Sequence, residues 1–133
     1  CLPEYHSSIY EYGKSRCPMN HPVVMFRKSS VIAAGGYQHL PLFEDYYLWV
    51  RMLMNGAMFY NLQEPLLSFR ATEDMFLRRG GWTYAMTELS FLWKIHKMGY
   101  VGSVKTLKNS VIRFIVRISP NRFRAFFYRN FLR

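Results

Sequence analysis

The stretch LFEDYYLWVRML (residues 42–53) constrains the fold of this chain more than any other segment. Two adjacent carboxylates, Glu44 and Asp45, stand directly before a nearly unbroken apolar run, and Asn55-Gly56 follows it. An acidic first turn, an apolar body and a closing glycine predict a helix from about Glu44 to Met54. Because few polar side chains remain around its circumference, we expect this helix to be buried on most sides.

The two carboxylates have two interpretations. At a helix N-terminus, acidic side chains accept hydrogen bonds from unpaired backbone N–H groups and meet the positive end of the helix dipole, an effect of about 0.3–1 kcal/mol. Alternatively, a carboxylate that aromatic neighbours partly desolvate can act as a general base. The two roles are compatible, since a helix N-terminus also holds a carboxylate in place.

The rest of the sequence predicts short strands and further helices. Runs of β-branched and aromatic residues are typical of strands, and glycine pairs are typical of helix ends. Strands are expected at residues 23–27, 57–62 and 66–70, a short helix is expected between a Ser29 or Ser30 cap and Gly35-Gly36, and mostly helical chain is expected over residues 73–98 with a break at Gly80-Gly81.

The composition fits one globular domain. Half of the 133 residues are hydrophobic and 18% are aromatic, which is ample for a core. No segment reaches the roughly 18 consecutive apolar residues of a membrane-spanning helix. Cys1 and Cys17 form neither a disulfide framework nor a metal-ligand cluster, which fits a reducing compartment. The first residues, CLPEYHSS, lack the features of a signal peptide, and we expect the chain to be a piece of a longer protein.

Residues 101–133 carry most of the net charge of +10. This segment holds eight basic residues and no acidic ones. On a helical wheel its apolar residues fall in one arc of about 100°, and a second amphipathic helix follows Ser119-Pro120. We expect the segment to bind an anionic membrane surface, the alternative being that its apolar stripe packs against the rest of the domain. The arc comprises Val104, Leu107, Val111, Phe114, Ile115 and Ile118.

Four segments, in this order, resemble the second half of family 2 glycosyltransferases: CPMNHPVVMFRKSSVIAAGGY, FEDYYLWVRMLMNG, EPLLSFR and RRGGW. The resemblance implies a GT-A fold and the transfer of a sugar from a nucleotide sugar with inversion. The expected fold class is therefore α/β, or α+β for a fragment, mostly helical with a few short strands. Residues 1–100 would be the acceptor-side half of the catalytic domain, and residues 101–133 a basic amphipathic helical tail.

The same resemblance implies roles for individual residues. In that family the Asp of the ED motif is the catalytic base that activates the acceptor hydroxyl, a role that falls here on Asp45, with Glu44 beside it in the acceptor site. An inverting transfer needs one such base, because the hydroxyl attacks in a single displacement. Further substrate-binding residues implied by the resemblance are His21, Arg70, Arg78, Arg79 and Trp82.

One feature of the family is missing from this sequence. The family's first half holds a divalent metal, Mn or Mg, on the donor diphosphate through a D-x-D motif, but Asp45 and Asp74 are the only aspartates here. We therefore expect no metal ligands in this chain, a missing N-terminal half that binds the donor, and no sugar transfer by the chain alone. Apolar surface exposed where that half docks would favour self-association.

Two classes of function follow. The first is the C-terminal portion of an inverting glycosyltransferase that adds a sugar to a lipid-linked glycan in surface polysaccharide synthesis, in the cytoplasm at the inner face of the plasma membrane. The second is a non-enzymatic basic helical module that binds an anionic membrane, nucleic acid or a partner protein. Because the basic residues accompany continuous apolar stripes, which membrane surfaces need and nucleic acids do not, nucleic acid is not expected as a partner.

Overall fold

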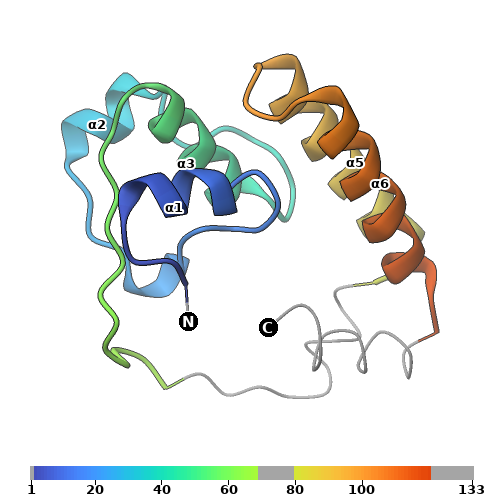
Figure 1. Cartoon of the computed structure of the whole chain (residues 1–133), viewed down its shortest axis with the longest axis horizontal. Helices are drawn as coiled ribbons and strands as arrows, with labels where there is room; N and C mark the ends of the chain where they lie inside the picture. Colours follow the sequence, from blue (N-terminus) through green and yellow to red (C-terminus); the bar gives the residue numbers. More distant parts are fainter. Residues whose placement is uncertain (1, 69–79, 121–133) are drawn as a thin grey trace.

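The structure, a computed structural model, describes residues 2–68 and 80–120, and every regular element in these ranges is a helix (Figure 1). The expectation of a few short strands is therefore wrong for the described chain, whereas the expectation of a mostly helical chain is confirmed. The elements are α1 (His6–Tyr12), the 3-10 helix η1 (His21–Val23), α2 (Lys28–Ala33), α3 (Glu44–Met54), α5 (Trp82–Lys97) and α6 (Ser103–Ile118).

The helix α3 has the bounds predicted from the sequence, and it is the centre of the fold. Every residue from Tyr46 to Leu53 is buried, including Arg51. α2 and α5 both pack on α3, and α6 packs on α5 from outside. Gly56 follows the helix with a φ of 80°, a conformation that glycine adopts without strain. The prediction of a helix buried on most sides is confirmed.

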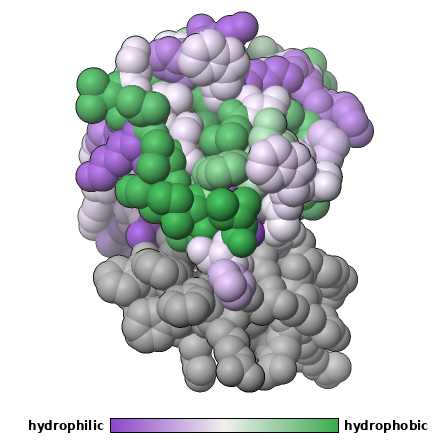
Figure 2. Space-filling model, turned by 90° about the vertical axis from the view of Figure 1, so that its right-hand side faces the viewer, coloured by the Kyte–Doolittle hydropathy of each residue, from purple (hydrophilic) through white to green (hydrophobic). Residues whose placement is uncertain are grey.

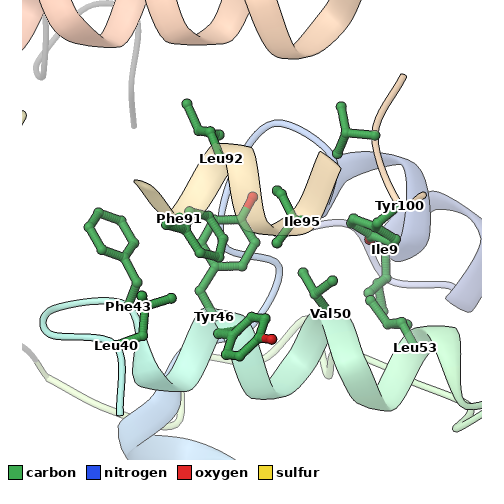
Figure 3. Packing of buried hydrophobic residues seen from close by; sticks show 12 residues of the cluster. Ile9, Leu40, Phe43, Tyr46, Val50, Leu53, Phe91, Leu92, Ile95 and Tyr100 are labelled. Carbon is green, nitrogen blue, oxygen red and sulfur yellow. The ribbon is translucent and has the colours of Figure 1, made fainter. Parts of the chain in front are cut away.

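Aromatic side chains join α3 to α5 (Figure 3). Phe91 of α5 stacks on Phe43 with ring centroids 5.0 Å apart, and its ring lies 4.6 Å from that of Tyr46. Ile95 and Val50 are fully buried in the same cluster. Each such side chain stabilises the fold by roughly 1.5–3 kcal/mol when it leaves water. This contact is therefore the main apolar core of the described chain.

The segments expected to be strands form no ladder in the described chain. Residues 57–63 run beside the N-terminal residues, where the backbone N–H of Asn61 donates to the carbonyl of Glu4 at 3.0 Å. A strand requires a row of such bonds to a neighbouring strand, and the described residues do not supply one. These segments leave apolar side chains in solvent, with Met25 98% and Met58 78% exposed. The expected self-association stays a prediction.

The helix α2 differs from its prediction at one end and agrees at the other. It begins at Lys28, and no side chain caps it, so the predicted Ser29 or Ser30 cap is wrong. The reason is that the carbonyl of Arg27 accepts the backbone bond that closes the first turn, which places both serines inside the helix. Gly35-Gly36 ends the helix with positive φ values of 82° and 63°, as predicted.

Arg51 fastens the end of α2 to α3. It is only 8% exposed, and its guanidinium donates to the carbonyl of Ala34 at 2.5 Å and to that of Gly36 at 2.7 Å. Carbonyl groups at a helix C-terminus lack partners within the helix, and hydrogen bonds from a charged donor are stronger than neutral ones. The turn that leads to Tyr37 is thus fixed to the buried helix.

A buried ion cluster holds α5 and α6 together. α5 begins after Gly81, which has a φ of 95°, so the helix starts where the break was predicted, while the predicted helical residues 73–79 lie outside the described residues. Glu88 of α5 is 1% exposed and accepts hydrogen bonds from Arg113 and from Nε of Arg117, the latter at 2.6 Å. Arg113 also donates to the carbonyl of Ser15. The cluster therefore connects α6 both to α5 and to the loop after α1.

Most of the apolar stripe predicted for the tail does not pack on the described chain. Phe114 is half-buried and its ring meets that of Trp82, but the other five members are exposed, with Val104 85% and Leu107 67% exposed. The alternative in which the stripe packs against the domain is therefore wrong for these five residues. None of the described helices is long and apolar enough to cross a bilayer. The predicted second tail helix lies in residues 121–133, outside the described ranges, and the boundary between residues 100 and 101 stays a prediction.

Gly13 lies where α1 meets Tyr100. The Tyr100 hydroxyl donates to the carbonyl of Tyr10 at 2.8 Å, and a Cβ on Gly13 would lie 2.4 Å from that hydroxyl oxygen. Gly13→Ala should lower the free energy of unfolding by about 1–3 kcal/mol, because an added methyl group in a filled site displaces its neighbours. Urea denaturation measures this, and the same substitution should cost less in a Tyr100→Phe background. Equal costs in both backgrounds would contradict the explanation.

Glu88→Gln should lower the free energy of unfolding by about 3–5 kcal/mol, because losing one partner of a buried ion pair leaves charge uncompensated in the interior. The matched control is Glu11→Gln, which removes the exposed pair between Glu11 and Lys14 and should cost less than about 1 kcal/mol. Both values come from urea denaturation. A small cost at Glu88 would mean that the cluster does not hold the two helices together.

Candidate functional site

Asp45 is half-buried in the first turn of α3. Its Oδ1 accepts the backbone N–H of Tyr46 at 2.7 Å, so the capping interpretation is confirmed for this carboxylate. Phe43 occupies the N-cap position and makes no side-chain cap bond. The N–H of Tyr46, which has no acceptor within the helix, is instead bonded by the Asp45 carboxylate. Oδ2 has no hydrogen-bond partner among the described residues. Oδ1 is therefore held by the helix, whereas Oδ2 is available to accept a hydrogen bond or a proton.

The chain reaches α3 through a strained turn. Leu42 has a φ of 71°, in the left-handed region that residues other than glycine rarely adopt. The N–H of Phe43 bonds back to the carbonyl of Leu40 at 2.9 Å, and both side chains are buried. Such a conformation costs about 1–3 kcal/mol and persists where surrounding packing enforces it. The burial of Leu40 and Phe43 thus fixes the position of the acidic first turn of α3.

Tyr37 and Cys17 are electrostatic neighbours of Asp45. Partial burial, and then the negative charge of Asp45, raise the pKa of the Tyr37 hydroxyl. Burial raises the pKa of the Cys17 thiol to about 12, and the Asp45 charge acts in the same direction. Because the thiolate rather than the thiol is the nucleophile, Cys17 contributes a neutral, unreactive group at physiological pH.

His21 contacts the same tyrosine. Its Nε2 lies 2.9 Å from the hydroxyl oxygen of Tyr37, and its ring meets the ring of Trp49 edge-on, with centroids 6.0 Å apart. Both His21 and Tyr37 are exposed. Tyr37 therefore contacts His21 directly, whereas Asp45 acts on it through its charge, with no hydrogen bond between the two among the described residues. These three side chains, His21, Tyr37 and Asp45, are called the Asp45 cluster below.

Two polar groups at this site were not singled out from the sequence. The sequence did contain a pattern that could have indicated Tyr37 as a site residue, since this aromatic residue directly follows the Gly35-Gly36 turn. Trp49 is 2% exposed, and its Nε1 has no hydrogen-bond partner in the described chain, although buried polar groups are ordinarily paired. No sequence pattern marks this donor, because an almost wholly apolar helix hides which residue faces which neighbour.

Of the other predicted site residues, the two that the structure describes, Glu44 and Trp82, are not brought into the Asp45 cluster. Glu44 is half-buried as the first residue of α3 and makes no hydrogen bond within the described ranges. Trp82 is 65% exposed at the start of α5, and its ring contacts that of Phe114 with centroids 5.8 Å apart. The remaining three, Arg70, Arg78 and Arg79, lie outside the described residues, and their roles stay predictions.

The described residues offer no metal centre. No three His, Cys, Asp or Glu side chains among them lie close enough together to hold an ion. Mn and Mg bind carboxylate oxygens in sets, and the Asp45 cluster supplies a single carboxylate. The divalent metal expected for the whole enzyme therefore has no ligands in the described part of this chain.

Curated bacterial proteins match nearly the whole chain. A UDP-Gal:alpha-D-GlcNAc-diphosphoundecaprenol beta-1,3-galactosyltransferase from Escherichia coli is 35% identical over 127 residues, which are 96% of this chain and 46% of that protein. The amylovoran biosynthesis glycosyltransferase AmsE from Erwinia amylovora is 34% identical over 127 residues, 96% of this chain and 48% of its own length. An uncharacterized glycosyltransferase from Haemophilus influenzae is 33% identical over 132 residues, 99% of this chain and 49% of its own length.

The chain spans about half the length of the curated relatives it matches. It is therefore homologous to part of a glycosyltransferase, which confirms the expected resemblance at this level. No model of a protein family matches the chain. No solved structure matches it either.

Substitutions at Asp45 separate its structural role from any chemical one. Asp45→Ala removes the acceptor for the Tyr46 N–H and should lower the free energy of unfolding by about 1 kcal/mol. Asp45→Asn keeps a side-chain oxygen at that place and should cost roughly half as much or less, since it loses mainly the interaction with the helix dipole. Thermal and urea denaturation of the two variants make the comparison. Equal destabilisation would contradict the capping role.

Proposed function

We propose that this chain is the acceptor-side, C-terminal portion of an inverting, nucleotide-sugar-dependent glycosyltransferase of family 2 that acts in surface polysaccharide synthesis. The observation that carries the proposal is the half-buried Asp45 carboxylate, which α3 holds by one oxygen while the other is available. Similarity to glycosyltransferases along nearly the whole chain supports the assignment. Because the curated relatives are about twice as long as this chain, the whole activity is proposed for a protein of about their length.

Asp45 would act as the general base of a single displacement. The acceptor hydroxyl oxygen forms a bond to the anomeric carbon of the donor sugar, the bond from that carbon to the diphosphate breaks, and the hydroxyl proton passes to Oδ2 of Asp45. The diphosphate leaves with the electron pair of the broken bond. A base fixed to the end of a buried helix needs little reorganisation, which favours this role.

The Asp45 cluster would bind the acceptor. Tyr37 is 49% exposed, and its ring offers an apolar face to a sugar while its hydroxyl is hydrogen-bonded to His21. We propose Glu44 as a further acceptor contact on the same turn. Arg70, Arg78, Arg79 and Trp82 remain proposed contacts to the acceptor or to phosphate.

The acceptor is proposed to be a lipid-linked glycan. The Escherichia coli relative is named for a diphosphoundecaprenol acceptor and a UDP-Gal donor, and a lipid-linked acceptor would place the enzyme in the cytoplasm at the inner face of the plasma membrane. The donor nucleotide sugar and a Mn or Mg ion on its diphosphate would be held by residues outside this chain. When bound, such an ion stabilises the charge on the departing diphosphate.

The alternative of a nucleic-acid-binding module has less support from the structure. Arg113 and Arg117 are turned inward and pair with Glu88. Part of the positive charge that would face phosphates is thus neutralised inside the fold. No specific contact among the described residues favours a nucleic acid.

In the full-length enzyme, Asp45→Asn should lower kcat at least a hundredfold, since general base catalysis contributes roughly 10²–10⁴-fold. Transfer of radiolabelled sugar to the acceptor measures kcat, and calorimetry with the donor should show unchanged donor binding. Glu44→Gln is the matched control on the same helical turn and should reduce kcat far less. Retention of more than about a tenth of wild-type turnover by Asp45→Asn would falsify the assignment of the base.

A further inference from the structure

The helix α6 turns several polar side chains inward and leaves most of its apolar stripe in solvent, the reverse of an ordinary surface helix. On the inward side, the amide of Asn109 donates to the carbonyl of Lys14 at 3.1 Å, and Arg113 and Arg117 pair with Glu88. These contacts hold the helix on the domain, and of its apolar stripe only Phe114 makes a ring contact with another described element, at Trp82. The rotation of α6 about its own axis is therefore set by its polar residues.

The apolar side of α6 forms a continuous band in solvent. At spacings of three and four residues, it extends over about 21 Å of helix. Val111, Phe114 and Ile115 also line a shallow groove with Leu89 of α5. Figure 2 shows hydrophobic side chains gathered across this side of the molecule, a feature that marks contact with a partner or a membrane. The outer band, each member of which is half exposed or more, consists of Val104, Leu107, Val111, Ile115 and Ile118.

The charges next to the outer band are positive. Lys108 is exposed and is a helical neighbour of both Val104 and Val111. The sequence from residue 101 to 133 contains eight basic residues and no acidic one. A second copy of the chain on this face would bring like charges together. A lipid bilayer with anionic headgroups instead matches both features, because it offers an apolar layer for the band and negative charge for the lysine.

We infer that the outer band of α6 docks on the surface of an anionic lipid bilayer, with the helix lying parallel to the bilayer plane. A bilayer accepts a convex helix face, whereas a protein partner would need a groove of matching shape. Glu88 gives the surface its structural basis, since it draws two arginines inward and so turns the apolar residues outward. The inference uses no property of the Asp45 cluster and stands apart from the proposed sugar transfer.

Co-sedimentation of the whole chain with vesicles tests the inference. The chain should bind vesicles that contain phosphatidylglycerol and should bind them less well as salt is added, whereas vesicles of phosphatidylcholine alone should bind weakly. Leu107→Ser/Ile115→Ser should weaken binding by about tenfold or more, because the side chains that enter the acyl boundary are lost. Lys108→Gln should weaken binding by about fivefold and reduce its dependence on salt.

A matched control distinguishes binding through the outer band from nonspecific binding by exposed apolar side chains elsewhere in the chain. Ile32→Ser/Met58→Ser replaces two side chains that are 63% and 78% exposed outside α6, comparable with the 67% and 55% of Leu107 and Ile115. This control should change binding by less than about twofold. Circular dichroism confirms that each variant melts cooperatively. If the α6 double variant does not, Val104→Ser takes its place at the most exposed position of the band.

Three outcomes would overturn the inference. The chain could fail to bind phosphatidylglycerol vesicles, or the α6 variant and the control could bind alike, which would place any membrane contact elsewhere in the chain. The third is a dimer, seen by analytical ultracentrifugation without lipid, that the α6 variant abolishes while vesicle binding is unchanged. Because the vesicles contain no acceptor or donor, none of these outcomes bears on the proposed sugar transfer, which is tested separately with the Asp45→Asn enzyme.

Discussion

Burial of α3 on nearly all sides is the constraint on which the other described elements depend. Trp49 and Met52 belong to an apolar cluster with Val31 of α2, while Val50 belongs to a second cluster with Phe91 of α5. A helix packed on opposite sides cannot shift along its axis without opening one of the two clusters. Its acidic first turn is therefore held by the core, although it reaches the surface. The chemistry proposed for that turn rests on the same packing that stabilises the fold.

Local signals were sufficient to predict α3, and non-local contacts account for most of what could not be predicted. The acidic first turn, the apolar body and the closing glycine of this segment all predict the same bounds for α3. Residues 57–62 were predicted as a strand, but strand pairing depends on residues distant in the sequence. The cap of α2 was missed because a backbone carbonyl, not Ser29 or Ser30, closes its first turn. The contact of Tyr37 with His21 crosses sixteen positions, beyond the reach of any local pattern.

For α6, a helical wheel predicted one property and could not predict another. The wheel located the apolar arc, but it carries no information on whether that arc faces the core or the solvent. The deciding residue is Glu88, a lone carboxylate in a largely apolar stretch of α5, for which a surface position would be ordinary. Once buried, this carboxylate requires partners, and Arg113 and Arg117 supply them from 25 and 29 positions away.

Cys17 has a consequence for how the Asp45 cluster responds to its surroundings. A thiol with a pKa of about 12 carries almost no thiolate at neutral pH. Oxidants and alkylating reagents act on the thiolate, so this side chain resists conversion to sulfenic acid, exchange with other disulfides and modification by thiol reagents. Cys17 therefore adds no negative charge near Asp45, and the charge of Asp45 itself acts in the direction that keeps the thiol protonated.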